Sequence, residues 1–240
     1  MSKRLKVVFL GLNDIGKKVL DYLKSIDQDD IFLITEKDQL VKIKSVLPDI
    51  ILSVGFRSIV PKEYISIPRL GAINFHKSLL PLHRGANPVF WTILGQTKAG
   101  VTIHYMDENI DTGDIIKQRE VGYSFNDTAA SLYRRLENVQ LELFKDTWPD
   151  IRSDQIEPYP QEGESSYHII ENFKALRRIN FENNSFEVIN FINYLKAMTF
   201  PPFNNAFIEI NNEKYYIELN IKEKGSSNSS DTLLKQYEVK

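Results

Sequence analysis

The sequence predicts an α/β protein with an open, mostly parallel sheet and helices on both faces, followed by a small helix and a β-hairpin. Over the first half of the chain, short apolar segments alternate with segments of helical periodicity. This alternation implies right-handed crossovers between parallel strands. Beyond residue 150 the alternation stops, and two short strand-like segments follow one helical segment. The main domain is therefore expected to be Rossmann-like.

Composition limits the classes of function. At 240 residues the chain is long enough for one α/β domain and a smaller appendage. Its formal net charge of −2 argues against nucleic-acid or acidic-membrane binding, which needs a basic excess. Without cysteine, disulfides, thiolate metal sites and a cysteine nucleophile are excluded. The N-terminal apolar run is too short for a signal peptide or a membrane span, so we expect a soluble, cytoplasmic protein.

The elements of the first half follow from local patterns. Leu5–Gly11 is a partly β-branched apolar run that ends in glycine, which is typical of a buried strand. The segment after it places its apolar residues on one side of a helix that Asn13 or Asp14 can cap. By the same reasoning, further strands are expected at 30–36, 49–55, 71–76 and 100–107, with helices at 38–47 and 86–94.

The second half suggests a change of domain. A long amphipathic helix over 128–148 is expected to close the main domain. We expect a domain at 1–150, a connecting segment rich in turn residues at 151–184, and a small C-terminal region at 185–240. In that region a helix at 185–198 precedes the strands 206–210 and 215–221, which Asn-Asn-Glu-Lys joins as a hairpin. An isolated hairpin is marginally stable, so we expect it to pair with a second subunit in a homodimer.

Two of the four histidines lie in one short stretch, Asn74–Gly85, which reads NFHKSLLPLHRG. Asn74 and His76 are two residues apart on a predicted strand, so their side chains point to the same face. They also lie near the carboxyl end of that strand, where sites form in open parallel sheets. Asp111 lies in a glycine-containing turn after another strand, from which its carboxylate can reach His76. Such a carboxylate would fix the tautomer of the imidazole and favour its protonated form.

These stretches resemble the core of the folate-dependent formyltransferases. That family has an Asn-x-His pair, then a Ser-Leu-Leu-Pro turn and Arg-Gly, and about 35 residues later the Asp of an Asp-Thr/Ala-Gly turn. The resemblance runs from about Lys6 to Asp150 and includes the loop SVGFRSIVP. It implies formyl transfer from N10-formyltetrahydrofolate to an amine.

The resemblance also implies catalytic roles for three residues. Asn74 and protonated His76 would donate hydrogen bonds to the oxyanion of the tetrahedral intermediate, where one well-placed donor lowers the barrier by about 3–4 kcal/mol. His76, or a water held by Asp111, would move the proton from the amine to the departing folate nitrogen. Asp111 would keep His76 oriented and charged. No metal is required for these steps.

Binding residues follow from the same resemblance. Phe56, Arg57 and Ile59 would line the pterin pocket, largely through backbone groups, and the loop from Asp107 to Ile110 would close its other side. For Phe56 and Ile59, simple core packing is an equally good interpretation.

Three residues beside the catalytic pair are candidates for the second substrate. Lys77, His83 and Arg84 would meet a substrate diphosphate as positive partners. Surface charge on a turn is the alternative for each of them.

The identity of the acceptor amine depends on the C-terminal region. Residues 181–240 contain six lysines and eight acidic residues, which makes a poor RNA-binding surface. The segment YLKAMTFPPFNNAFIEINNEKYYI instead resembles the one that follows the core in nucleotide-sugar N-formyltransferases.

The acceptor that we favour is therefore a dTDP-linked amino sugar, with dTDP-4-amino-4,6-dideoxyglucose first, made for a surface polysaccharide such as O-antigen. The 3-amino isomer, glycinamide ribonucleotide and methionyl-tRNA remain open. A formyltetrahydrofolate hydrolase or a folate-binding module without turnover would be a different class of function.

Overall fold

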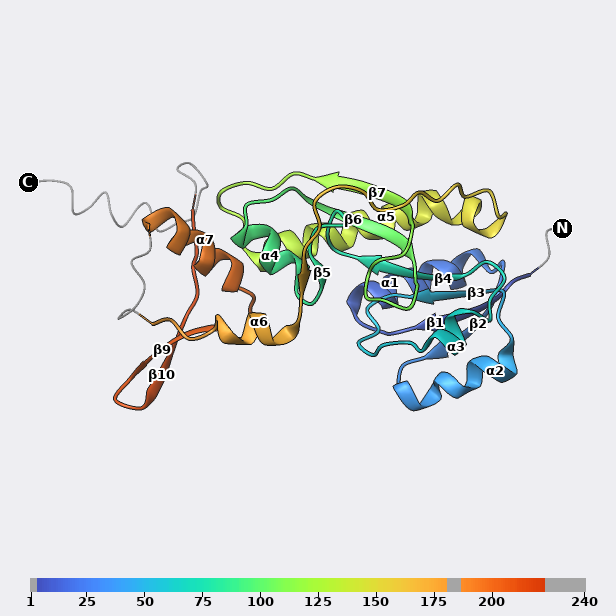
Figure 1. Ribbon diagram of the computed structural model, residues 1–240, viewed down its shortest axis with the longest axis horizontal. Helices are drawn as coiled ribbons and strands as arrows, with labels where there is room; N and C mark the ends of the chain where they lie inside the picture. The colour runs from blue at the N-terminus through green and yellow to red at the C-terminus, as the bar shows by residue number, and fades with distance from the viewer. Residues whose placement is uncertain (1–3, 181–186, 223–240) are drawn as a thin grey trace, which may run out of the picture.

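The computed structural model describes residues 4–180 and 187–222. Figure 1 shows a central sheet with helices packed around it, and a helix and hairpin that extend to one side. The sheet has six strands in the order β2-β1-β3-β4-β6-β7. Their bounds are Lys6–Leu10 for β1, Asp30–Ile34 for β2, Ile50–Ser53 for β3, Ala72–His76 for β4, Ala99–Tyr105 for β6 and Ile115–Val121 for β7.

The sheet is parallel on one side and antiparallel on the other. β1 pairs in parallel with β2 and β3, and β3 pairs in parallel with β4. β6 runs antiparallel to β4, and β7 runs antiparallel to β6. The predicted mostly parallel sheet is confirmed, with the addition of β7, which the sequence analysis did not identify as a strand.

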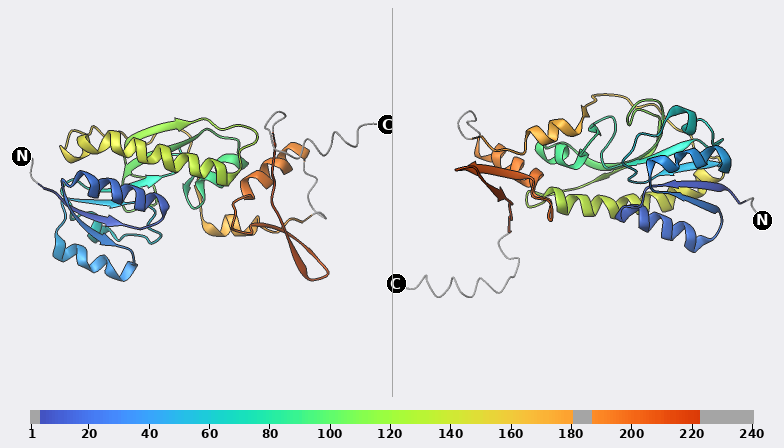
Figure 2. Two further views of the ribbon diagram at one scale, coloured as in Figure 1. Left: turned by 180° about the vertical axis from the view of Figure 1, so that it is seen from behind. Right: turned by 90° about the horizontal axis from the view of Figure 1, so that it is seen from below.

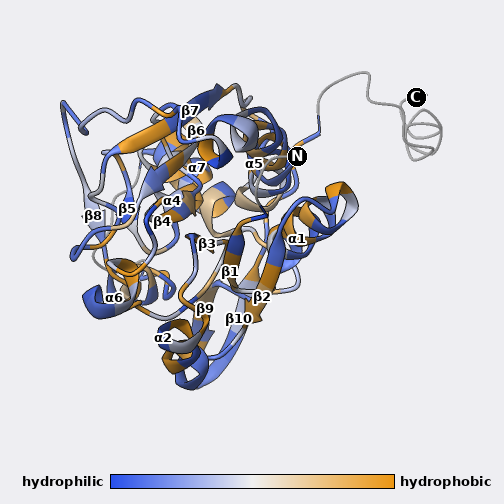
Figure 3. Ribbon diagram, turned by 90° about the vertical axis from the view of Figure 1, so that its right-hand side faces the viewer, coloured by the Kyte–Doolittle hydropathy of each residue, from blue (hydrophilic) through white to orange (hydrophobic). Residues whose placement is uncertain are grey.

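Helices cover both faces of the sheet, as predicted. The two faces of β1 belong to two different hydrophobic cores. Val7 and Phe9 pack with α1 and α5 on one face, whereas Val8 and Leu10 pack with η1 and α2 on the other. Figure 3 shows the apolar residues running through these strands. The helices are α1 Asp14–Ile26, η1 Lys37–Lys42, α2 Ile43–Val46, α3 Lys62–Ile65, α4 Pro88–Leu94 and α5 Ala129–Arg152.

Helix ends follow from local hydrogen bonding. The side chain of Asn13, rather than that of Asp14, caps α1 by accepting a hydrogen bond from the Gly16 amide at 2.9 Å. The predicted helix over 38–47 is split into a 3₁₀ turn, η1, and a single turn of α-helix, α2. α5 continues past residue 148 to Arg152, whose side chain donates to the buried carboxylate of Asp29 at 3.0 and 3.1 Å.

The described part of the connecting segment, up to residue 180, lies against the main domain. Its strand β8, Tyr167–His168, pairs in parallel with β5, Arg84–Gly85, and Tyr159 forms a bridge with Ile115 of β7. A short helix, α6, follows at Ile170–Ala175. This segment therefore passes directly beside the stretch that carries the predicted site.

The described part of the C-terminal region contains the helix and hairpin that the sequence predicts. α7, Val188–Met198, packs against α4 and α5 with its C-terminal half, Asn193–Met198, buried, and the strands β9, Ala206–Ile210, and β10, Glu213–Ile217, form a hairpin. The turn has two residues, Asn211 and Asn212, both with positive φ, instead of the four predicted. Asparagine tolerates this conformation, which two-residue hairpins require.

The hairpin projects away from the central sheet in both Figure 1 and Figure 2. Within residues 4–180 and 187–222, no helix combines the length and the apolar character that crossing a bilayer requires. Residues 181–186 and 223–240, which include the start of the predicted C-terminal helix, lie outside the described part of the chain.

Candidate active site

The predicted pair lies where the sequence places it. Asn74 and His76 occupy the carboxyl end of β4, and their side chains share one face of the strand. The antiparallel neighbour β6 brings His104 opposite Asn74. Asp111 follows β6 in the turn that leads to β7, and its backbone has φ +55°. Three elements thus meet at one end of β4.

The Asp111 carboxylate is the centre of the cluster. Its Oδ1 accepts a hydrogen bond from Asn74 Nδ2 at 3.1 Å, and its Oδ2 accepts one from the Gly85 amide at 2.9 Å. His76 Nδ1 lies 3.4 Å from Oδ2, and His104 Nε2 lies 3.5 Å from Oδ1. The side chains of His76, His104 and Asp111 are 7%, 2% and 10% exposed. The side chains of His76, His104 and Asp111 therefore form one buried group, and the partly buried Asn74 joins it through its hydrogen bond to Asp111.

The charge state of this group differs from the prediction. Burial would raise the pKa of Asp111, but interaction with His76, His104 and the Gly85 amide holds it well below its usual range. Burial lowers the pKa of His76, and although Asp111 and a backbone carbonyl oppose that effect, burial dominates. Near pH 7 the pair is therefore an ionised carboxylate beside a mostly neutral imidazole. The expectation that Asp111 keeps His76 charged is wrong for the free protein.

Both ring nitrogens of His76 face an acceptor. Nε2 lies 2.8 Å from the carbonyl oxygen of His83, so it carries the hydrogen in the neutral ring. Nδ1 faces the Asp111 carboxylate. A proton taken up at Nδ1 gives an imidazolium whose two N–H groups both have acceptors. The site is built to hold a proton on His76 transiently.

Both amide hydrogens of Asn74 are directed at neighbours. His104 Nδ1 lies 2.8 Å from the carbonyl oxygen of Tyr105, so that nitrogen carries a hydrogen, and in the neutral ring Nε2 is an acceptor. Asn74 Nδ2 lies 3.3 Å from His104 Nε2, in addition to its bond to Asp111. A substrate oxygen that binds Asn74 must therefore replace His104 as the acceptor. The sequence analysis did not assign His104 to the site and missed this contact.

A glutamine from the connecting segment holds the turn of Asp111. Gln161 Nε2 donates to the carbonyl oxygens of Asp111 and Gly113 at 2.9 and 2.8 Å. Its Oε1 accepts from Arg84 Nε and Nη2 at 3.1 and 2.7 Å. Arg84, expected to meet a diphosphate, thus already has a protein partner. No local pattern in the sequence indicated Gln161.

The ring of His83 lies in the interior. Its Nε2 lies 2.7 Å from Thr97 Oγ1, and its ring stacks against His168 of β8, which in turn stacks on Trp91 at 3.9 Å between ring centroids. Burial, with His168 and His76 nearby, lowers the pKa of His83 to about 4. A neutral, buried imidazole does not fit the positive role that we predicted for it toward a diphosphate. Its carbonyl group serves the site instead.

Lys77 directs its ammonium group over the ring of Tyr133 in α5, 4.4 Å from the centroid. Burial lowers the pKa of Lys77 to about 8, and Glu137 opposes this shift. Burial also raises the pKa of Tyr133 to about 12, with Glu137 contributing. Among the contacts of the described residues, neither Lys77 nor Arg84 has a carboxylate within ion-pair distance, and Arg84 is held by the amide of Gln161.

The residues expected around the pterin lie in two exposed loops. Phe56 is half-buried against the core that η1 and α2 cover, whereas Arg57 is exposed and Ile59 is 71% exposed, which excludes core packing for Ile59. Across from them, Asp107 Oδ1 accepts from the amide of Asn109 and from Thr112 at 2.9 and 2.6 Å. Ile110 at the tip of that loop is 38% exposed.

A surface ion pair joins these two loops. Lys62, at the start of α3, lies 2.8 Å from Glu108. The exposed apolar side chains on the two loops offer surface that a planar ring system can cover.

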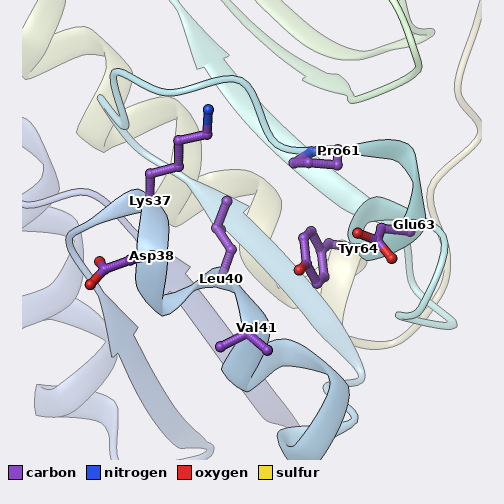
Figure 4. Close-up of a pocket in the computed structure, with 7 residues that line it drawn as sticks. All are labelled: Lys37, Asp38, Leu40, Val41, Pro61, Glu63 and Tyr64. Atoms are coloured by element: carbon purple, nitrogen blue, oxygen red, sulfur yellow. The ribbon is translucent and has the colours of Figure 1, made fainter.

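A separate cavity of about 520 Å³ opens between η1 and α3. None of the predicted site residues lines it; its walls are Lys37, Asp38, Leu40, Val41, Pro61, Glu63 and Tyr64 (Figure 4). In the described ranges, no group of three or more His, Asp or Glu side chains is arranged to hold a metal ion.

Comparison with known proteins places these observations in a family. The formyl transferase family matches residues 34–147, and the N-formyltransferase dimerization C-terminal domain matches residues 172–223. The chain is 37% identical over 195 residues to a methionyl-tRNA formyltransferase from Clostridioides difficile, and the match covers 80% of this chain. It is 35% identical over 180 residues to a GDP-perosamine N-formyltransferase from Brucella melitensis, with 71% of this chain covered. These matches span 63% and 64% of the two relatives' own lengths.

A solved structure is matched over most of its own length. The formyltransferase PseJ from Anoxybacillus kamchatkensis, solved with UDP-4,6-dideoxy-4-formamido-L-AltNAc and tetrahydrofolate, is 38% identical with a TM-score of 0.64. The match covers 71% of this chain and 88% of that one. With the buried group of Asn74, His76 and Asp111 at the end of β4, these matches identify the chain as a member of the formyl transferase family.

Proposed function

We propose that this protein transfers the formyl group of N10-formyltetrahydrofolate to the amino group of a nucleotide-linked amino sugar. The observation that carries the proposal is the buried contact of Asn74, His76 and Asp111, in which an amide donor, a proton acceptor and an ionised carboxylate meet. Formyl transfer to an amine needs a hydrogen-bond donor for the developing oxyanion, a group that accepts the proton of the amine, and a negative charge that stabilises the protonated base. The family match and the complex of PseJ with a nucleotide sugar and tetrahydrofolate support the same reaction.

The first step forms a bond between the amine nitrogen and the formyl carbon. The formyl oxygen gains negative charge, and an amide hydrogen of Asn74 stabilises it once the contact with His104 is given up. Because His76 is mostly neutral in the free protein, it can take the proton that the amine releases. The imidazolium then has Asp111 beside Nδ1 and the carbonyl oxygen of His83 beside Nε2.

The second step breaks the bond between the formyl carbon and N10. The proton held on His76 passes to N10 as the intermediate collapses, which leaves tetrahydrofolate and the formamide. The oxyanion that Asn74 stabilised becomes the neutral carbonyl oxygen of the formamide, and His76 returns to its neutral state. Asp111 stays ionised throughout, because its pKa lies well below its usual range.

The folate would bind between the loop after β3 and the turn after β6. Ile59 and Ile110 expose apolar surface there, and Arg57 is available to the glutamate tail of the folate. Lys77 would serve the diphosphate of the acceptor, since burial and the lack of a bonded carboxylate favour an anionic partner. Arg84 can contribute as well through the guanidinium hydrogens that Gln161 does not engage.

The acceptor is proposed to be an amino-dideoxy sugar, and dTDP-4-amino-4,6-dideoxyglucose is the first candidate, as an intermediate of surface polysaccharide. The C-terminal match to a dimerization domain and the acidic balance of residues 181–240 both favour a sugar over an RNA substrate. The relatives use different nucleotides, so the dTDP group rests on the sequence resemblance alone. The 3-amino isomer is the second sugar to test.

The second candidate function is formylation of methionyl-tRNA. The 37% identity to the enzyme from Clostridioides difficile favours it. The same site would carry out the same chemistry, so the two functions differ only in the acceptor.

We further propose that the C-terminal hairpin forms a homodimer. Ile210, Tyr215 and Tyr216 on the hairpin are 51%, 48% and 47% exposed. Ile210 and Tyr215 lie on one face of the hairpin and Tyr216 on the other, so the hairpin, which projects from the main domain (Figure 2), exposes apolar surface on both faces. Pairing with a second hairpin would cover it, in agreement with the matched dimerization domain.

A turnover assay tests the function. The protein is incubated with N10-formyltetrahydrofolate and, separately, dTDP-, UDP- and GDP-linked 3-amino and 4-amino sugars, glycinamide ribonucleotide and methionyl-tRNA. Mass spectrometry then detects the gain of one formyl group, and His76→Asn serves as the control. Formylation of one sugar, abolished in the control, is expected. Product from methionyl-tRNA alone would replace the sugar with the second candidate, and folate release without an acceptor would indicate a hydrolase.

A further inference from the structure

The amide of Gln161 makes four hydrogen bonds, which use its full capacity. Nε2 donates to the carbonyl oxygens of Asp111 and Gly113, and Oε1 accepts two bonds from Arg84. The donations run to the backbone of the turn that carries the carboxylate, not to the carboxylate itself. Fifty residues separate Gln161 from Asp111, so this contact depends on the fold and not on local sequence.

The turn of Asp111 needs outside support. Its residue has φ +55°, a conformation that a side chain other than glycine adopts at a cost. The turn bends so tightly that a Cβ on Gly113 would overlap the carbonyl oxygen of Tyr105. The two hydrogen bonds that Gln161 donates to the carbonyl oxygens of Asp111 and Gly113 offset that cost and fix where the Asp111 carboxylate points.

The other end of the same amide is fixed to the strand that faces Asp111. Arg84 and Gly85 form β5, and the Gly85 amide donates to Asp111 Oδ2 at 2.9 Å. Gln161 therefore bridges the strand that binds the carboxylate and the turn that carries it. Movement of either relative to the other would lengthen the contact between Asp111 and His76, which is 3.4 Å.

From this geometry we propose that Gln161 is a positioning residue: it sets the distance between the Asp111 carboxylate and His76 by tying the turn at Asp111 to β5. It does not touch the reacting atoms. The proposal rests on the proposed function only for the effect on rate. The effect on His76 concerns the free protein and is independent of the reaction.

The test replaces Gln161 with methionine, which keeps the length of the side chain and removes all four hydrogen bonds. Gln155→Met is the matched control, because Gln155 is exposed and its amide reaches only the carbonyls of Ser153 and Asp154. Gln161→Glu is the second variant, since it keeps an acceptor for Arg84 but loses both donations to the turn. Thermal unfolding shows that each variant is folded before it is used.

The first readout is the pKa of His76 from its C2 proton in an NMR titration. Besides Asp111, the titratable groups near this ring are His104, Lys77 and His83, and none of them is altered. We expect the pKa of His76 to fall in Gln161→Met, toward its value in Asp111→Asn, and to be unchanged in Gln155→Met. An unchanged pKa in Gln161→Met overturns the proposal, as does an equal fall in the control.

The second readout is the rate of formyl transfer. We expect kcat to fall about 10- to 100-fold in both Gln161 variants, with KM for the folate donor within about twofold, since misplacing a group by about 1 Å can have an effect of that size. A rise in KM at constant kcat would assign Gln161 to substrate binding and overturn the proposal. If the wild-type protein has no formyl transfer activity but the pKa of His76 still falls, the proposed function fails and the positioning role stands.

Discussion

Replacing Asp111 with asparagine tests the electrostatics of the site most directly. Two main effects act on the pKa of His76: burial lowers it, and the Asp111 carboxylate raises it. The variant keeps the burial and loses the carboxylate. We therefore expect the pKa of His76 to fall below its already lowered value, so that the ring stays neutral to more acidic pH.

The size of the shift follows from the distance. With an effective dielectric constant of about 20, unit charges 3.4 Å apart attract each other by about 5 kcal/mol. At about 1.36 kcal/mol per pKa unit, this sets an upper limit of roughly three to four units. The amide oxygen of the variant still presents a dipole to the ring and can still accept from Gly85. We therefore expect a smaller fall of roughly one to three units, the usual effect of a nearby charge.

The assay is an NMR titration of the C2 proton of His76, assigned by comparison with His76→Asn among the four histidines. The acid limb of the pH–rate profile should move to lower pH together with this pKa, because the neutral ring takes the proton from the amine. The maximal rate should fall about 100-fold or more, since the imidazolium loses the charge that stabilises it. A pKa of His76 that is unchanged or raised in the variant would refute the reasoning.

Three further predictions concern stability and assembly. Gly113→Ala should cost about 1–3 kcal/mol of unfolding free energy in urea and lower the rate, because its Cβ overlaps backbone, whereas Gly122→Ala, with nothing within 4 Å, should leave the rate unchanged. Arg152→Met should cost roughly 3–5 kcal/mol, because it leaves a buried carboxylate unpaired, but Arg119→Met, with exposed partners, should cost at most about 1 kcal/mol. Ile210→Asp should convert a dimer to a monomer in sedimentation velocity; a wild-type monomer at micromolar concentration would refute the proposed hairpin pairing.

The sequence predicts those strands that are buried on both faces, because burial gives them a recognisable apolar pattern. β1 and β3 lie inside the sheet and are covered on both faces, so they appear as unbroken apolar runs. β7 is an edge strand of which only the ends are buried, and its middle residues, Lys117–Glu120, are polar. β5 and β8 have two residues each. Nothing in such short or polar segments distinguishes a strand from a loop until its partner is known.

The candidate site could likewise be predicted only in part. Asn74 and His76 could be predicted as a pair because the period of a strand puts residues two apart on one face. Their relation to Asp111 was supported by the family resemblance. His104 and Gln161 reach the same group from β6 and from the connecting segment, and no spacing along the chain encodes either contact.

The charge on His76 shows what sequence reasoning leaves out. From the sequence, an aspartate beside a histidine predicts a raised histidine pKa, because the attraction between the two charges is the one effect that the sequence indicates. The other part is the loss of water around the ring, which depends on how the strand, the turn and β5 close over it. In this structure the second effect exceeds the first. A neutral His76 can accept a proton, and the Asp111 carboxylate beside Nδ1 and the His83 carbonyl oxygen beside Nε2 then stabilise the imidazolium; burial keeps the ring neutral until that proton arrives.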